Sequence, residues 1–142
     1  MTALRAVAWL SGDQDAAERY SCRICETQKT IPPRKALLGC DEPIDTATWK
    51  DGERPGARGP NRELHVGPVG FRSWRCPRAW ANDPIAVECW AAYRWWEAGQ
   101  LALRYAPDPV PSKVVEAIDI VRVTHHTAEH QYFERHRQKP GG

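Results

Sequence analysis

The spacing of the cysteines is the feature of this sequence that most constrains its fold. Cys22 and Cys25 form a C-x-x-C pair, and single cysteines follow at Cys40 and Cys76. The tight turn of a C-x-x-C pair directs both sulfurs at one tetrahedral ion, but two thiolates do not complete such a site. Cys40 directly follows Gly39, where a glycine lets the backbone turn sharply. We therefore predict that these four cysteines hold one structural metal ion, zinc before any other.

The same cysteines admit other interpretations. His65 is the main alternative ligand of a zinc site, in place of one cysteine. A second alternative is that the thiols bind no metal and are free or packed in the core. The remaining alternatives are a redox dithiol and an iron–sulfur cluster, although the tight C-x-x-C-x-x-C run of bacterial ferredoxins is absent. Cys89 lies within a predicted helix and is expected to be a buried, small apolar side chain. A metal site would make folding depend on the ion and on thiolate formation.

Length and composition place the chain among single globular domains. It has 142 residues, of which 42% are apolar and 27% charged, so we expect one domain over residues 1–142. We find no signal peptide and no run of the roughly 18 to 20 apolar residues that a membrane span needs. The expected location is the cytoplasm, or a virion assembled in the host cytoplasm. In a reducing compartment, five cysteines favour metal binding over disulfides.

Three helical regions are predicted, which makes the expected fold α+β and mostly helical. Ala3–Tyr20 is the first, with an interruption at Gly12 and a second short helical turn capped by Asp13. Asp83-Pro84 is a favourable start for the second helix, and Gly99 is a favourable stop. The third begins near Ser112 and continues to Arg137, further than the core requires. Its apolar positions recur at the spacing of an amphipathic helix: Val114, Ala117, Ile118 and Val121.

The two halves of the domain differ in character. Residues 1–80 form a cysteine-rich half with a basic loop over residues 50–70, and residues 81–142 form a helical half that ends in a polar, histidine-rich tail. Glycine and proline are so frequent in the basic loop that we expect only short hairpin strands there, around His65-Val66 and within residues 69–74. A loop of about twenty residues is often functional, so it is a candidate contact surface.

Arginines are concentrated between residues 54 and 78. This segment contains six arginines against one acid, Glu63: Arg54, Arg58, Arg62, Arg72, Arg75 and Arg78. Together with Phe71, Trp74 and Trp80 it is a candidate nucleic-acid surface, on which arginines hold phosphates and rings stack on bases. The alternative is a solvated loop whose arginines pair with upstream acids, namely Asp41, Glu42, Asp45 and Asp51. The pI of 8.3 is lower than is typical of a dedicated nucleic-acid domain.

Aromatic side chains cover more than one face of the second predicted helix: Trp90, Tyr93, Trp95 and Trp96. One face must contribute to the core. A second aromatic face either packs beneath the basic loop or meets a partner, because tryptophan is enriched at binding hot spots. Trp95 and Trp96 are therefore candidate contacts to another protein. Nucleic acid is the alternative partner, self-association is compatible with the same surface, and no membrane contact is expected.

The sequence contains one motif of metalloproteases and no other catalytic pattern. His126-x-x-Glu129-His130 matches H-x-x-E-H, and a helix would place both histidines on one face. A hydrolase of this kind needs a third ligand from a distant segment, and the sequence offers none beyond Glu134 on the same helix. We therefore interpret the motif as a solvated helix with histidines near its C-terminal end, and we expect no enzymatic activity.

The order of these features resembles that of small accessory proteins encoded among the tail genes of tailed bacteriophages. The matching parts are Cys22-x-x-Cys25, Leu37-Leu38-Gly39-Cys40, Cys76-Pro77-Arg78, Gly99–Tyr105 and Pro109–Ile120. The resemblance implies a role in virion assembly or as a minor structural component of the tail, without catalysis. The expected function is thus a zinc-stabilised, non-enzymatic assembly protein, and the alternative is a zinc-knuckle nucleic-acid-binding regulator that uses residues 54–78.

Overall fold

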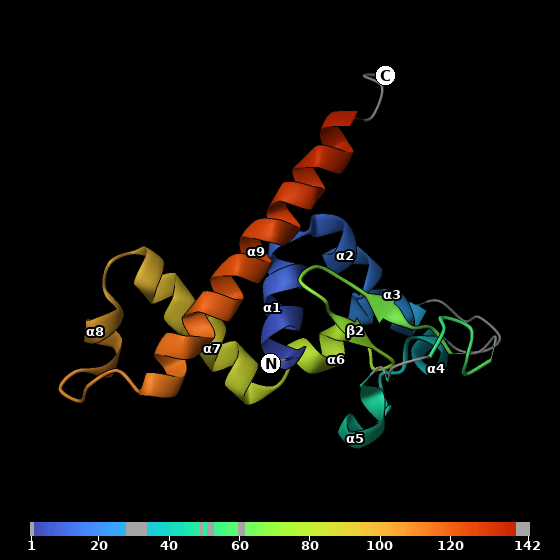
Figure 1. Ribbon diagram of the computed structural model, residues 1–142, viewed down its shortest axis with the longest axis horizontal. Helices are drawn as coiled ribbons and strands as arrows, with labels where there is room; N and C mark the ends of the chain where they lie inside the picture. Colours follow the sequence, from blue (N-terminus) through green and yellow to red (C-terminus); the bar gives the residue numbers. More distant parts are fainter. Residues whose placement is uncertain (1, 28–33, 49, 51–52, 60–61, 139–142) are drawn as a thin grey trace.

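The computed structural model describes residues 2–27, 34–48, 50, 53–59 and 62–138. Over these residues the protein is mostly helical, with one small antiparallel sheet, as predicted (Figure 1). None of the described helices has the length and apolarity needed to cross a membrane. The elements are α1 (Thr2–Gly12), α2 (Gln14–Arg19), α3 (Cys22–Thr27), α4 (Arg34–Leu38), α5 (Ile44–Ala47), β1 (His65–Val66), β2 (Arg72–Ser73), α6 (Pro77–Ala81), α7 (Pro84–Glu97), α8 (Leu101–Tyr105) and α9 (Ser112–Gln138).

Helix α1 is the central element of the fold. It packs against α9, α6 and α7 (Figure 1). The small side chains of Ala6 and Ala8 are fully buried along it, which allows neighbouring helices to approach closely. At its end, a Cβ atom on Gly12 would lie 2.7 Å from the carbonyl oxygen of His125 on α9. Only glycine allows this contact between the two backbones.

The core consists of two clusters of buried side chains that share α1. The first joins α1 and α2 to the hairpin and α6, with Trp9, Phe71 and Trp80 among its members. The second joins α1 to α7 and α9, with Tyr93 and Val121 at its centre. Because α1 contributes to both clusters, the cysteine-rich half and the helical half are packed as one body.

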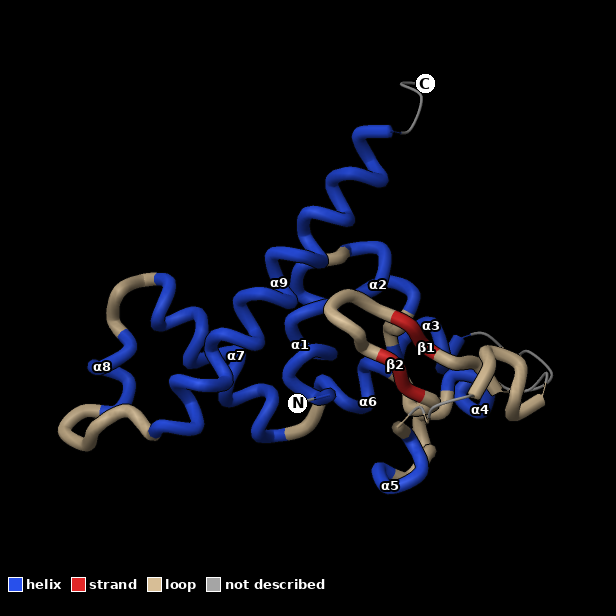
Figure 2. The backbone as a smooth tube through the Cα atoms, in the orientation of Figure 1, coloured by secondary structure: helices blue, strands red, loops and turns tan. Residues whose placement is uncertain are grey.

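The predicted hairpin is present. β1 pairs with β2 in antiparallel register, with His65 opposite Ser73 and Val66 opposite Arg72. The turn between them places Gly67 against the ring of Trp9, where an added Cβ would lie 2.8 Å from the nearest ring carbon. This contact fixes the hairpin on α1, and the backbone trace shows the hairpin turn beside α1 (Figure 2).

The predicted helix starts and stops are confirmed. Asp13 caps α2 by accepting a hydrogen bond from Ala16 N, and Asp83 caps α7. On α7, Val87 is 52% exposed. Apolar residues occur on all sides of α7. The sequence pattern alone therefore does not show which side of the helix faces the core. The residues buried instead are Ala86, Cys89, Ala92 and Tyr93.

The C-terminal part of α9 is attached to the body of the protein. Arg135 Nη2 donates to Asp13 Oδ2 over 2.7 Å, and His136 Nε2 lies 3.0 Å from Asp15 Oδ2. Tyr132 OH donates to Gln14 Oε1 over 2.9 Å. None of residues 129–137 is buried, so this part of α9 extends beyond the core and is attached to the junction of α1 and α2 by polar contacts.

Candidate metal centre

The four predicted ligands come from three separate segments that meet beside the first core cluster. Cys22 and Cys25 lie on α3, Cys40 lies in the turn after α4, and Cys76 directly precedes α6. A cavity of about 220 Å³ opens between these segments. Its lining includes Cys22, Cys25 and Cys40 together with Arg78, while Cys76 is buried at 2% exposure.

The thiols of this cluster influence one another. Burial raises the pKa of the Cys40 thiol to about 12, and the neighbouring thiols of Cys76, Cys25 and Cys22 act in the same direction. Burial also raises the pKa of the Cys76 thiol, although the main-chain N–H groups of Arg78 and Ala79 oppose this by donating hydrogen bonds to it. Side chains 54 residues apart, those of Cys22 and Cys76, are thus brought into one cluster by the fold.

The backbone at Gly39 holds two of the cysteine-bearing turns together. Gly39 has a φ of +76°, as the sharp turn predicted before Cys40 requires. Its carbonyl oxygen accepts a hydrogen bond from Cys76 N over 3.2 Å. A Cβ atom on Gly39 would lie 2.1 Å from the carbonyl oxygen of Trp74. No other residue allows the Cys40 turn to lie so close to the chain before Cys76.

The donor set suits zinc, but the sulfurs do not stand in ligand positions. Across the described part of the chain, no three His, Cys, Asp or Glu side chains are arranged so that they could hold a metal ion. Rotation about χ1 moves a cysteine sulfur between staggered positions while the backbone stays in place. The main chains of Cys40 and Cys76 are held close to each other by the contact between Gly39 and the chain before Cys76.

His65 is placed as a core residue and not as a metal ligand. It is 1% exposed. Its Nε2 lies 2.7 Å from the carbonyl oxygen of Leu38, and its Nδ1 lies 3.1 Å from Tyr20 OH. Since a carbonyl only accepts, Nε2 carries the proton and Nδ1 accepts from the tyrosine. Both ring nitrogens are therefore occupied, which argues against the variant site in which His65 replaces a cysteine.

The Cys40 and Cys76 thiols lack the property of a reactive cysteine. A reactive cysteine needs a thiolate at neutral pH and hence a lowered pKa. Burial instead raises the pKa of both the Cys40 and the Cys76 thiol. A bound cation would reverse this preference, because a metal-coordinated thiol is deprotonated.

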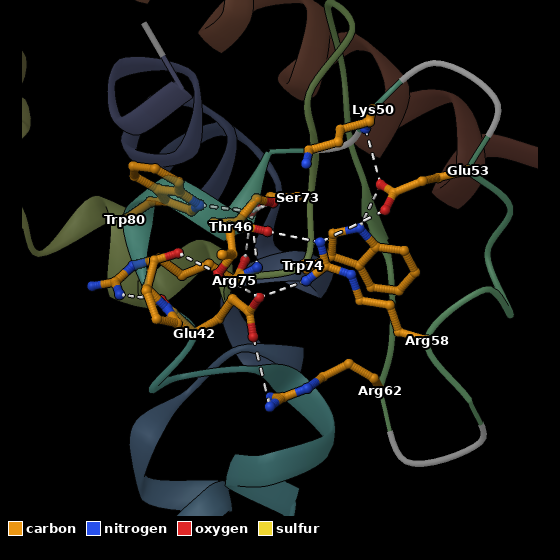
Figure 3. Close-up of polar contacts among 12 residues, drawn as sticks. Glu42, Thr46, Lys50, Glu53, Arg58, Arg62, Ser73, Trp74, Arg75 and Trp80 are labelled. Carbon is orange, nitrogen blue, oxygen red and sulfur yellow. Dashed lines mark hydrogen bonds and ion pairs between the residues drawn. The ribbon is translucent and has the colours of Figure 1, made fainter.

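The arginine-rich segment is organised around one buried carboxylate, that of Glu42 (Figure 3). The Glu42 side chain is 9% exposed, and its Oε1 lies 2.5 Å from Arg58 Nη1. Arg62 Nη2 lies 3.6 Å from the other carboxylate oxygen. Arg75 Nη1 donates to the main-chain oxygen of Glu42 over 2.8 Å. Three of the six predicted contact arginines thus converge on one acidic residue.

A second carboxylate, which the sequence analysis did not single out, completes this network. Glu53 Oε2 accepts hydrogen bonds from Trp74 Nε1 and from Lys50 N, each over 2.9 Å. The Arg58 guanidinium lies 4.7 Å from the ring centre of Trp74 and 3.7 Å from Glu53. Figure 3 shows Arg58 between the two carboxylates. Glu53 lies in a stretch without periodic pattern, so no sequence signal indicated its role.

The remaining residues of the predicted nucleic-acid surface are dispersed. Arg78 lies against the carbonyl oxygens of Tyr20 and Ala17, at 3.4 and 3.5 Å, and Arg54 and Arg72 are exposed. The three rings expected to stack on bases, Phe71, Trp74 and Trp80, are 2%, 0% and 8% exposed. That stacking expectation is wrong, because the hairpin turns these rings into the core. Of the acids proposed as partners, Glu42 takes this role, Asp41 and Asp45 have exposed side chains, and Asp51 lies outside the described residues.

Trp95 and Trp96 lie near the end of α7, at the surface. They are 37% and 45% exposed. The Trp96 ring stacks on Tyr93 at a centroid distance of 6.0 Å, and the Arg104 guanidinium lies 6.0 Å from the centre of the Trp95 ring. Three other large apolar side chains on α7 and α8 are also exposed, namely Ile85, Val87 and Leu103.

The residues of the H-x-x-E-H motif all lie on α9. His126 and His130 both lie on α9 with exposed side chains, and His126 Nε2 is 3.5 Å from Tyr93 OH. Within the described residues no further metal-binding side chain joins them to make a group of three. The arrangement agrees with a solvated helix face.

Comparisons with known proteins add no relative. No protein-family model matches the chain, and no curated protein or solved structure shows a significant similarity to it.

Proposed function

We propose that this protein is a non-enzymatic assembly protein whose fold is stabilised by one zinc ion at Cys22, Cys25, Cys40 and Cys76. The observation that carries the proposal is the clustering of these thiols from α3, the Cys40 turn and the start of α6. Four thiolates at one site are the ligand set of structural zinc. The ion would neutralise sulfurs whose burial otherwise keeps them protonated.

The role of the site would be architectural. The three segments that carry the cysteines have little regular structure of their own, with α3 and α4 spanning 6 and 5 residues. Helices this short are not stable in isolation. A shared ion would fix them to α6 and, through Tyr20 and Trp80 of the first core cluster, to α1. Closed four-cysteine sites leave no open position for a substrate, which agrees with a protein that does not catalyse a reaction.

The surface offered to a protein partner would be the outer side of α7 and α8. Trp95, Trp96 and Leu103 are large apolar side chains left exposed there, and tryptophans dominate the binding energy of many interfaces. Together with the resemblance described above, this surface supports a role as an assembly or minor structural component of a bacteriophage tail.

The decisive experiment is elemental analysis of untagged protein purified without added metal, with an absorption spectrum of the same sample. We expect one zinc per chain in the wild type and its loss in Cys22→Ser and Cys76→Ser. Cys89→Ser is the matched control, because Cys89 is equally buried but belongs to the second cluster. Protein without metal, or with equal zinc in all variants, would refute the site. Iron in the sample together with visible absorption would indicate an iron–sulfur cluster in place of zinc.

The nucleic-acid alternative has less support, because Arg58, Arg62 and Arg75 already lie against Glu42. It makes a separate prediction, since affinity that depends on phosphate contacts falls steeply as salt increases. Binding of duplex DNA or RNA at low salt with such a slope would favour it. We expect no such binding.

A further inference from the structure

The turn that carries Cys40 is held by hydrogen bonds that do not involve a cysteine side chain. Helix α4 ends just before this turn, and the last carbonyl groups of a helix have no partner within the helix. Three consecutive carbonyls there accept hydrogen bonds from the chain between residues 63 and 76. The bonds run from Glu63 N to Leu37 O over 3.0 Å, from His65 Nε2 to Leu38 O over 2.7 Å, and from Cys76 N to Gly39 O over 3.2 Å.

His65 supplies the one side-chain donor among these three bonds. The main-chain N–H groups of Glu63 and Cys76 would be present with any residue other than proline at those positions, whereas the bond to Leu38 depends on the imidazole. The imidazole is buried, since the His65 side chain is 0% exposed. Removal of this ring would leave a buried carbonyl without its donor, which opposes folding of the turn.

The other ring nitrogen connects the same histidine to the segment of Cys22. His65 Nδ1 lies 3.1 Å from Tyr20 OH, and the two rings meet edge to face at a centroid distance of 5.1 Å. Tyr20 caps the end of α2, two residues before Cys22. Burial raises the pKa of the Tyr20 hydroxyl to about 12 and lowers the pKa of His65. The tyrosine therefore keeps its proton and the imidazole stays neutral, as this pair of hydrogen bonds requires.

We infer that His65 is a positioning residue of the cysteine centre. Its ring holds the Cys40 turn against the end of α2, while the bond from Cys76 N holds the same turn against the start of α6. A ligand whose segment is already held in place loses less conformational freedom when the ion binds, which increases the affinity of the site. As far as it concerns zinc, the inference rests on the proposed function, and His65 acts there through the main chain and not as a ligand.

The test is amide hydrogen exchange of the full ¹⁵N-labelled chain as purified, because exchange reports the opening of individual segments. His65→Leu removes both ring nitrogens and keeps an apolar side chain. We expect exchange at the amides of Cys76 and Glu63 to become about tenfold faster, with little change at the amide of Val121 on α9. His65→Gln retains a side-chain N–H donor and should restore part of the protection.

Val121→Ala is the matched control for a general loss of stability. Val121 is also fully buried, but it belongs to the second core cluster. Both variants should lower the melting temperature, and only His65→Leu should accelerate exchange at Cys76 and Glu63 more than at the amides of α9. Unchanged exchange at these two amides in His65→Leu, or an equal acceleration in Val121→Ala, would overturn the inference.

Metal binding separates this inference from the proposed function. His65→Leu should retain one zinc per chain and the absorption spectrum of Co²⁺ bound by four thiolates, with the zinc affinity lowered about tenfold in competition with a chelator. A changed Co²⁺ spectrum in this variant would identify His65 as a ligand and overturn the positioning role. A wild type that binds no metal would refute the proposed function alone, and the exchange comparison would still decide whether His65 holds the Cys40 turn.

Discussion

The main-chain N–H of Cys76 donates a hydrogen bond to the carbonyl oxygen of Gly39 over 3.2 Å. This contact joins the turn that carries Cys40 to the turn that carries Cys76. It depends on glycine, since the φ of Gly39 is +76° and the space for a Cβ is taken by the Trp74 carbonyl. The relative position of the Cys40 and Cys76 turns is thus set by this backbone contact.

Gly39→Ala should be more destabilising than an alanine at another left-handed glycine. Gly99 is the matched control, because its φ is +72° and nothing lies within 4 Å of an added Cβ. Gly99→Ala should lower the free energy of unfolding by about 1 kcal/mol through backbone strain alone. Gly39→Ala should lose about 2 kcal/mol more from overpacking, measured by urea unfolding. Equal losses of unfolding free energy in the two variants would show that the backbone at Gly39 can move away from the Trp74 carbonyl at little cost.

Removal of zinc should affect the two core clusters unequally. The first cluster includes Cys25, Cys40 and Cys76, whereas the second contains none of the proposed ligands. A chelator should therefore lower the melting temperature and expose the cysteine-rich segments, while most of the helical circular dichroism of α7 and α9 is retained. Protease digestion of the chelated protein should cut first between residues 22 and 76. A melting curve unchanged by the chelator would contradict a structural role for the ion.

Glu42→Gln should destabilise the protein by about 2 kcal/mol, because it leaves guanidinium groups without their charged acceptor. The Glu42 side chain is 9% exposed and lies 2.5 Å from Arg58. The control is Asp45→Asn, since Asp45 has an exposed side chain on the neighbouring helix α5 and should change stability by less than about 0.5 kcal/mol. If both variants unfold at the same urea concentration, the buried carboxylate does not organise the arginine segment.

His65 should make stability decrease as the solution becomes acidic. Burial lowers the pKa of His65 below its ordinary value of 6.5, so the unfolded chain takes up the proton first. The contribution of His65 to the free energy of unfolding is therefore fully present above pH 6.5. It is lost as the pH falls from 6.5 through the pKa of His65 in the folded state. Unfolding between about pH 8 and pH 5 should be less pH-dependent in His65→Gln than in wild type.

The matched control for His65 is His130→Gln, because His130 is exposed on α9. Comparison of variants is necessary, since protonation of metal-bound thiolates would decrease stability in the same direction. A pH dependence that His65→Gln leaves unchanged would mean that the cysteines or the other histidines account for it.

The sequence by itself determined the features that depend on neighbouring residues. Asp13 and Asp83 cap their helices, the hairpin forms at His65-Val66, and Gly39 adopts the turn expected before Cys40. Each follows from backbone chemistry within a few residues, such as an N-cap oxygen or a glycine at positive φ. The helix start and stop signals also predicted the mostly helical fold.

Only the tertiary structure decided which polar groups pair and which apolar residues are buried. Asp13 meets Arg135 across 122 residues, and Glu42 meets Arg75 across 33. Local pattern contains no information on such pairs, because every arginine in the segment is equally able to bind a carboxylate. The burial of Trp74 and the exposure of Val87 depend likewise on how α1 packs between the hairpin and α9. The metal site at four cysteines stays a prediction from spacing, and the fold contributes the contact between Gly39 and Cys76 that joins two of their segments.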